Sequence, residues 1–299
     1  MHTEPLVSII IPTFNRAHLI GETIQSVLDQ SYSNWELIII DDGSTDDTEN
    51  YINKFNDNRI HYHAIEHCGI LGKVRNEGLR YSKGDFIAFL DSDDLWLPHK
   101  LEVQLSLLKK YPQAAFVFGH GEQFGNGAIP PPELEYLFVG NVFYPMLLNE
   151  RFVFYVPTIM FKKTIFEKTK AIDESLLSGG DIDFFLRMAN VYEGSFSNEI
   201  VVRIRKHEQS HSQRLESIAY EEYLGMIKRF LRKGFLTSMQ YHEIASRQYY
   251  KLGLLYLSRD NRKKAMGCFA RYIKIKPFHI KGWIRWIQSA LPPGLARSL

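Results

Sequence analysis

The sequence predicts an α/β protein with a doubly wound, mostly parallel central sheet, followed by an α-helical extension at the C-terminus. Up to about residue 115, short apolar runs rich in β-branched residues alternate with stretches of helical periodicity, which is typical of strand–helix–strand units. Beyond about Arg214 the pattern changes to successive amphipathic helices. We therefore expect one large α/β domain and a smaller helical part.

The first strand is expected at Leu6–Ile11, because this continuous apolar run suits a strand that is buried on both faces and Pro12 ends it. The same reasoning applies along the chain, where turn-rich segments such as 41–48 close the strands. The expected strands are residues 6–11, 35–40, 59–64, 85–90 and 114–118, and the expected helices are 17–30, 46–55, 71–81 and 98–110.

Three later segments have weaker patterns. Residues 119–158 are rich in Gly and Pro and then in aromatic residues, so we expect a long, partly irregular connection over the site. A Gly pair at 179–180 is expected to open a helix with Asp181 near its N-terminus, and 196–210 to form a strand followed by a polar loop.

The C-terminal part has two notable features. Residues 246–277 place small side chains among aromatic and leucine positions, like a single tetratricopeptide-type hairpin, which we expect to pack against its neighbours because one repeat cannot form a solenoid. The last stretch, 279–299, mixes Ile and Trp with Lys281 and Arg285. It is expected either to lie at a membrane surface or to dock on the rest of the protein.

Composition narrows the class of protein. The 299 residues are 45% apolar and 23% charged, as is ordinary for a globular protein. Cys68 and Cys268 form no CxxC or Cys/His ligand pattern, so neither a zinc site nor a disulfide framework is expected. The apolar runs are shorter than a membrane span, and the N-terminus lacks the layout of a secretory signal. We expect a cytoplasmic location, and peripheral contact of the basic C-terminal helices with the inner face of the membrane is left open as one of the two alternatives for residues 279–299.

The small net charge of +2 hides an uneven distribution. Residues 1–202 hold 16 Lys and Arg against 28 Asp and Glu, whereas residues 203–299 hold 20 against 6. This asymmetry indicates either two parts with different partners or only two differently charged solvated surfaces.

Polar clusters follow three of the expected strands. They are PTFNR at 12–16, DDGS at 41–44 and DSDD at 91–94. Parallel sheets bind ligands beyond the carboxyl ends of their strands, so we expect the three clusters to meet at one edge.

The DSDD cluster concentrates three carboxylates in four positions, and such like charges need a compensating cation. Hard oxygen ligands on a loop after a buried strand suit Mg²⁺ or Mn²⁺ shared with substrate phosphates. The alternative is a helix N-cap, which we expect for Asp94 but which explains the three together poorly. An EF-hand is excluded, because no Gly and distal Glu follow at the required spacing.

The other clusters have simpler explanations as well. Asp41 or Asp42 could hydrogen-bond a base or ribose, or could belong to an ordinary Asp-Gly turn. PTFNR could be a proline-terminated strand with an Asn turn. No GxGxxG or GxxxxGK[ST] stands at a strand–helix junction, which argues against dehydrogenases and P-loop proteins.

Taken in order and spacing, three stretches resemble the family 2 glycosyltransferases of the GT-A fold. They are VSIIIPTFNR, LIIIDDGSTDDT and GKVRNEGLRYSKGDFIAFLDSDDLWLP. The resemblance continues through AIDESLLSGGDIDFFLRMA and more loosely to VRIRKHEQS, so it covers about residues 5–210. It implies a GT-A domain at 1–212, with a nucleotide-binding half at 1–118 and an acceptor-side half at 119–212, followed by a basic helical extension at 213–299.

The resemblance also implies a nucleotide-diphosphate sugar donor, with UDP-sugar favoured, a Mg²⁺ or Mn²⁺ ion and inversion at the anomeric carbon. Asp181 matches the catalytic base, although Gly180 stands where many members have Glu. Asp93 and Asp91 match the DxD pair that holds the metal, and His207 matches a late metal or phosphate ligand. The residues implied to bind the nucleotide sugar are Pro12, Thr13, Phe14, Asn15, Asp41, Arg75, Asp91 and Ser92.

The expected reaction is attack by an acceptor hydroxyl, deprotonated by Asp181, on the donor sugar in one step. The acceptor is expected to be a saccharide, a lipid-linked group or a protein in bacterial surface polysaccharide or glycolipid synthesis, and no nucleic acid partner is expected. Two alternatives are a sugar-1-phosphate nucleotidyltransferase and a non-catalytic module that recruits partners through the helical tail. PTFNRAHLI lacks the Gly-rich basic loop of the first, and intact Asp41, Asp91, Asp93 and Asp181 argue against the second.

Overall fold

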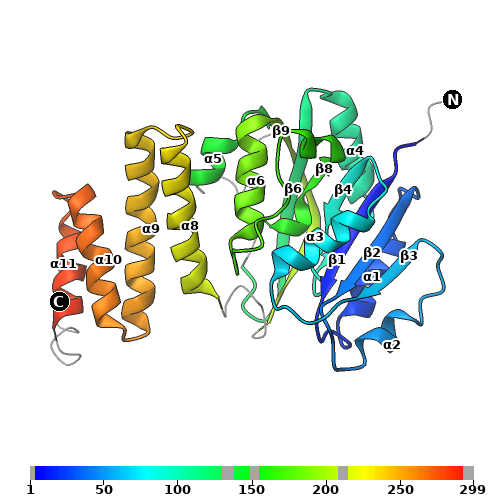
Figure 1. Ribbon diagram of the computed structural model, residues 1–299, viewed down its shortest axis with the longest axis horizontal. Coiled ribbons are helices and arrows are strands. Elements are labelled where there is room, and N and C mark those ends of the chain that lie inside the picture. Colours follow the sequence, from blue (N-terminus) through cyan, green and yellow to red (C-terminus); the bar gives the residue numbers. More distant parts are fainter. Residues whose placement is uncertain (1–3, 130–137, 149–154, 208–214, 292–299) are drawn as a thin grey trace. The chain divides into compact units, whose positions relative to one another are not determined.

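A computed structural model describes residues 4–129, 138–148, 155–207 and 215–291 of the chain (Figure 1). The chain divides into two compact units, residues 1–210 and 211–299. The first unit contains a mixed sheet with helices around it, and the second is built of helices. The fold class predicted from the sequence is confirmed, including the helical C-terminal region.

The first half of the sheet is parallel, with strands in the order β3–β2–β1–β4. Every residue of β1 and β2 is buried, as their continuous apolar runs predict. The strands here are β1 (Val7–Thr13), β2 (Trp35–Asp41), β3 (Ile60–Ala64) and β4 (Phe86–Phe89), and the helices are α1 (Ile20–Leu28), α2 (Thr48–Ile52), α3 (Leu71–Tyr81) and α4 (Lys100–Lys110).

The second half of the sheet mixes directions. Strand β8 (Met160–Lys162) is antiparallel to both β4 and β6 (Ala114–Gly125), and β6 is parallel to β9 (Glu193–Lys206). Two short strands, β5 (Leu95–Trp96) and β7 (Phe138–Gly140), pair antiparallel with β9. The helices of this half are α5 (Phe143–Leu148) and α6 (Gly180–Val191), with single 3₁₀ turns at Val156–Thr158 and Lys163–Glu167.

Two expectations for the first unit are wrong. β6 continues to Gly125 instead of ending at residue 118, so the start of the expected irregular connection is strand; residues 130–137 and 149–154 of that connection lie outside the described residues. Helix α4 begins at Lys100 after His99, so Asp94 is not its cap. Asp94 instead accepts a hydrogen bond from the Arg205 backbone N–H of β9 at 2.8 Å.

The second unit consists of α8 (Glu216–Arg232), α9 (Ser238–Ser258), α10 (Arg262–Ile275) and α11 (Ile280–Ala290). Helices α9 and α10 pack together as the expected hairpin, around a core that includes Leu252, Ala265 and Phe269. Helix α11 packs on α10 at Gly282, where a Cβ atom would lie 2.7 Å from the Tyr272 ring. In the part of the chain that the structure describes, no helix is both long and apolar enough to cross a bilayer.

Candidate active site

The loops that follow β1 and β2 are joined through Asn15. This residue has the left-handed φ of 51°, a conformation that Asn tolerates better than most residues. Its side-chain oxygen accepts the Thr45 backbone N–H at 2.8 Å, and its own N–H donates to the Ser44 hydroxyl at 2.8 Å. The Asp42 N–H donates to the Thr13 carbonyl at 2.9 Å, so the two clusters form one edge as expected.

Asp41 and Asp42 are both buried but have different partners. Asp41 accepts the Ser44 N–H at 2.8 Å and the Tyr62 hydroxyl at 3.0 Å. Burial and the neighbouring Asp41 raise the pKa of Tyr62 above its ordinary value, so this hydroxyl stays protonated and donates. Asp42 accepts the backbone N–H groups of Cys68 and Gly69 at 2.8 and 2.9 Å, which makes it a turn residue.

The first loop presents an aromatic surface. The Phe14 ring stacks on His67, with centroids 4.3 Å apart and planes inclined by 22°. Phe14 is 37% exposed, so the pair is accessible from solvent. The Thr13 hydroxyl is buried without a hydrogen-bond partner among the described residues, and Pro12 lies buried beside it in β1.

The DSDD loop is surrounded by cationic and basic side chains from distant parts of the sequence. Asp93 Oδ2 lies 2.9 Å from His207 Nε2 and 4.0 Å from Arg16 Nε. Arg205 Nε donates to the Asp93 carbonyl at 2.9 Å, which holds β9 against this loop. Burial and the neighbouring Asp91 and Asp93 raise the pKa of Asp94 well above its ordinary value. The repulsion expected for this cluster is therefore offset partly by the protein's own side chains.

Ser92 is buried, and its carbonyl accepts the Thr23 hydroxyl of α1 at 3.1 Å. Its implied contact with the donor remains a prediction.

Arg75 is the central cation of the site. It lies on α3, is fully buried, and donates to Asp91 through one terminal nitrogen and to Asp181 through the other. Burial lowers the pKa of Arg75, but the two carboxylates outweigh it and the pKa is raised overall. The structure thus brings together the DxD carboxylate Asp91 and the expected base Asp181.

Burial raises the pKa of Asp91 to about 6, with further contributions from Asp93 and Asp181, although Arg75 opposes the rise. The Asp91 side chain is nevertheless 32% exposed, so a ligand can reach it.

Asp181 stands in the first turn of α6 and is largely buried. Its Oδ2 accepts from Arg75, whereas its Oδ1 is buried with no hydrogen-bond partner among the described residues. A buried acceptor without a donor is costly unless a ligand supplies one. Gly180 allows α6 to start here, because a Cβ atom would lie 3.0 Å from the Ile172 side chain.

Sequence comparison identifies the family. Residues 8–169 match the model described as glycosyl transferase family 2, which is more than half of the chain. The chain belongs to glycosyltransferase family 2. This family 2 glycosyltransferase is 44% identical over 124 residues to UDP-Glc:alpha-D-GlcNAc-diphosphoundecaprenol beta-1,3-glucosyltransferase WfgD from Escherichia coli, covering 42% of this chain and 49% of that protein. It therefore spans about half the length of that relative.

Solved structures show the same fold. S. aureus TarS 1-349 in complex with UDP-GlcNAc matches with a TM-score of 0.62 and 17% identity, covering 90% of this chain and 88% of that one. The mannosyltransferase PcManGT from Pyrobaculum calidifontis, in complex with GDP-Man and Mn²⁺, matches with a TM-score of 0.63 and 16% identity, covering 90% and 75%. This family 2 glycosyltransferase has the GT-A fold that the sequence implies.

The residues of the DSDD loop fit a divalent cation as partial ligands. No three His, Cys, Asp or Glu side chains converge as a metal site within the described ranges. Mg²⁺ and its analogues commonly use one or two carboxylates and take the remaining ligands from water and substrate phosphates. Asp93, with His207 beside it, and the partly exposed Asp91 supply oxygen and imidazole donors of that kind.

Three contributors to the site were not predicted from the sequence: Arg16, His67 and Arg205. Arg16 and Arg205 lie in stretches used for the family resemblance, PTFNR and VRIRKHEQS, but nothing in their spacing shows which carboxylate each would meet. His67 follows β3 outside any motif, and the structure reveals it by its stacking on Phe14 and by its Nδ1, which lies 3.0 Å from Asp42 Oδ2.

Proposed function

We propose that this family 2 enzyme transfers a sugar with inversion from a UDP-sugar to an acceptor hydroxyl, using Mg²⁺ or Mn²⁺. The observation that carries the proposal is the Arg75 bridge, which holds Asp91 and Asp181 together and leaves Asp181 Oδ1 without a donor. The hydroxyl of an acceptor would supply the hydrogen-bond donor that Asp181 Oδ1 lacks among the described residues. Asp181 would take its proton as the new glycosidic bond forms, because a hydroxyl is too weak an acid to ionise first.

The chain's own residues prepare this step. Arg75 orients Asp181, since its charge is permanent and both of its terminal nitrogens are engaged. A divalent cation held by Asp93, Asp91 and His207 would neutralise the charge that develops on the leaving diphosphate. Positioning of the acceptor hydroxyl against Asp181 then supplies much of the acceleration.

For the donor, we assign the nucleotide to residues 1–118 and the acceptor to 119–212. Phe14 and His67 offer a stacking surface for a base, and Asp41 lies nearby beneath the same loops as a hydrogen-bond acceptor. The name of WfgD, which is 44% identical over 124 residues, includes UDP-Glc, which supports uridine; of the two solved structures, one contains UDP-GlcNAc and the other GDP-Man. The roles of Pro12, Thr13, Asn15 and Ser92 belong to this proposal.

For the acceptor, we propose a lipid-linked saccharide in bacterial surface polysaccharide synthesis. The acceptor in the name of WfgD is a sugar on diphosphoundecaprenol, and such lipids stay in the membrane. This setting requires the enzyme to work at the cytoplasmic face of a bilayer.

Helix α11 supports that location. Its side chains Ile280, Trp283, Ile284 and Ile287 are exposed at positions i, i+3, i+4 and i+7, whereas its buried residues are Gly282, Gln288 and Ser289. We propose that this apolar stripe inserts into an anionic bilayer, because Lys281 and Arg285 accompany it on the helix and its unit is strongly basic.

The transfer proposal is tested by a donor screen. Uridine, guanosine and thymidine diphosphate sugars are added with Mn²⁺ and the melting temperature is measured, followed by a radiolabel transfer assay with polyprenyl-diphosphate saccharides. UDP-sugars are expected to stabilise the native enzyme. Absence of stabilisation by all three nucleotide classes would refute the proposal.

The membrane proposal is tested separately by vesicle flotation. The double variant Trp283→Ser and Ile287→Ser is expected to lose binding to vesicles that contain phosphatidylglycerol. Met239→Ser, which removes an apolar side chain that is 79% exposed on α9, is the matched control. Equal flotation of both variants and the wild type would exclude insertion of α11.

A further inference from the structure

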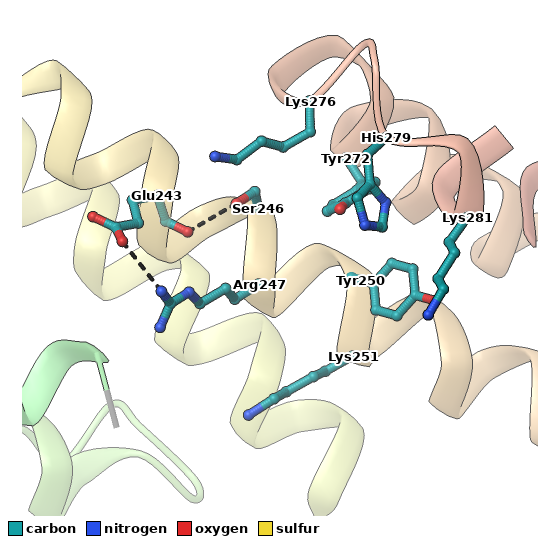
Figure 2. A pocket seen from close by; sticks show the side chains of 9 residues that line it. All are labelled: Glu243, Ser246, Arg247, Tyr250, Lys251, Tyr272, Lys276, His279 and Lys281. Atoms are coloured by element: carbon teal, nitrogen blue, oxygen red, sulfur yellow. Dashed lines mark hydrogen bonds and ion pairs between the residues drawn. The ribbon is translucent and has the colours of Figure 1, made fainter. Parts of the chain in front are cut away.

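The second unit contains a cavity of about 490 Å³ that the transfer reaction does not use. Its lining comes from α9, the end of α10, the turn that follows and the start of α11 (Figure 2). This volume is in the range of small-ligand sites. The lining side chains are Glu243, Ser246, Arg247, Tyr250, Lys251, Tyr272, Lys276, His279 and Lys281.

The cavity is rich in positive charge. Four of its side chains are Lys or Arg, and its single carboxylate, Glu243, is already paired with Arg247 at 3.1 Å (Figure 2). Lys251, Lys276 and Lys281 form no ion pair with any carboxylate in the part of the chain that the structure describes. Like charges gathered in a concave site repel one another and attract an anion.

Aromatic groups complete the lining. The Tyr250 ring lies 5.1 Å from Tyr272, and the His279 ring lies 5.4 Å from Tyr272, measured between centroids. Burial and the neighbouring Tyr250 raise the pKa of Tyr272, so its hydroxyl is protonated at neutral pH and can donate a hydrogen bond. The cavity therefore offers ammonium groups and neutral donors together.

Two exposed apolar side chains are sequence neighbours of the cavity residues. Phe278 is 96% exposed and Ile280 is 74% exposed, and they alternate in sequence with the cavity residues Lys276, His279 and Lys281. Such a site suits an anionic group that is attached to an apolar molecule.

We propose that this cavity binds a phosphate group, carried either by a membrane lipid head group or by a diphosphate. Ammonium groups of lysine bind phosphate as point charges from several directions, which three lysines around one cavity allow. The site lies in the second unit and is independent of the transfer chemistry, so either proposal can fail without the other.

The test compares two triple variants of the full chain that lose the same charge. The cavity variant is Lys251→Gln, Lys276→Gln and Lys281→Gln, and the control is Lys228→Gln, Lys233→Gln and Lys263→Gln, three exposed lysines of the same unit outside the cavity. Circular dichroism establishes that both are folded. Inorganic pyrophosphate is titrated by calorimetry with EDTA present, so that metal-dependent binding in the first unit does not contribute.

The wild type and the control are expected to bind pyrophosphate, and the cavity variant to bind roughly tenfold more weakly or worse. Flotation with phosphatidylglycerol vesicles then distinguishes the source of the phosphate. A loss on vesicles that is confined to the cavity variant, and that persists in Lys251→Gln with Lys276→Gln where Lys281 of α11 is kept, assigns the phosphate to a lipid head group. A loss with pyrophosphate alone assigns it to a diphosphate. Equal losses in both triple variants, or no loss in the cavity variant with either probe, would overturn the proposal.

Discussion

Two fully buried cations in the first unit, Arg75 and Lys100, are compensated in opposite ways. Arg75 donates to the carboxylates of Asp91 and Asp181, and these raise its pKa despite burial. The Lys100 amine donates to Gln104 Oε1 at 2.5 Å and lies 4.1 Å from the Trp96 ring centre. Burial holds the pKa of Lys100 well below its ordinary value.

This difference indicates that the charge of Arg75 is functional, whereas Lys100 has a structural role. A guanidinium cannot lose its proton, so the environment of Arg75 must supply negative charge, and the carboxylates that do so are those of the proposed site. A lysine can become neutral when no carboxylate is near, and Lys100 then serves as a hydrogen-bond donor in the core. We therefore expect changes at Arg75 to affect transfer and stability, and changes at Lys100 to affect neither strongly.

Arg75→Met tests the first half of this comparison and should have the largest effect. Removal of the cation leaves two carboxylates close together without compensation, which costs about 3–5 kcal/mol of unfolding free energy. Urea unfolding measures this loss, and transfer should fall below detection. If Arg75→Met kept both properties of the wild type, the bridge would have no role.

Asp93→Asn should remove transfer while leaving the fold intact. This side chain is partly exposed beside His207, so its loss affects cation binding more than packing. We expect roughly a 1,000-fold decrease in kcat/KM, because a metal contributes several kcal/mol to stabilising the transition state. Mn²⁺ binding in the presence of UDP, followed by electron paramagnetic resonance, should weaken in parallel. Unchanged Mn²⁺ binding would remove Asp93 from the ligand set.

Asp42→Asn tests a carboxylate that accepts two backbone N–H groups and lies 3.0 Å from His67 Nδ1. The amide would place a donor against the Cys68 or Gly69 N–H, at a cost of about 1–3 kcal/mol of unfolding free energy. Transfer at a temperature where the variant is folded should stay within about threefold of the wild type, since a turn residue contacts no substrate. A loss as large as that of Asp93→Asn would place Asp42 in the site.

Lys100→Met should have the smallest effect near neutral pH and a distinct effect on pH dependence. Between the lowered pKa of folded Lys100 and the unfolded value of about 10.4, only the unfolded state holds the proton, so stability rises with pH in that interval. The variant should lack this rise when melting temperatures are measured from neutral to alkaline pH. An identical slope in both proteins would show that Lys100 is charged in the folded state.

Local features of the fold could be read from the sequence, and long-range pairings could not. Helix α3 occupies the predicted residues Leu71–Tyr81, and β1 follows its apolar run, because both depend on short patterns. Strand β8 enters antiparallel between β4 and β6, and no local pattern of three residues reveals this. The first half of the sheet was therefore predictable in direction, and the second half was not.

The same division applies to the site. The rule for parallel sheets predicts that the three strand ends meet at one edge. The structure agrees for all three clusters, PTFNR, DDGS and DSDD. The basic side chains beside Asp93 lie far away in sequence, since Arg205 is 112 and His207 is 114 positions from it. From the sequence, only a metal ion could be proposed to compensate the negative charge of DSDD, because residues so far apart in the chain form no periodic pattern.

The central claim is that Asp181 Oδ1 accepts the proton of the acceptor hydroxyl while Arg75 holds Oδ2. The most direct measurement compares Asp181→Asn with the wild type for both UDP affinity and single-turnover transfer. We predict UDP affinity within about twofold and a transfer rate lowered by about 100- to 10,000-fold, the usual contribution of a general base. Transfer by Asp181→Asn at close to the wild-type rate would contradict the account.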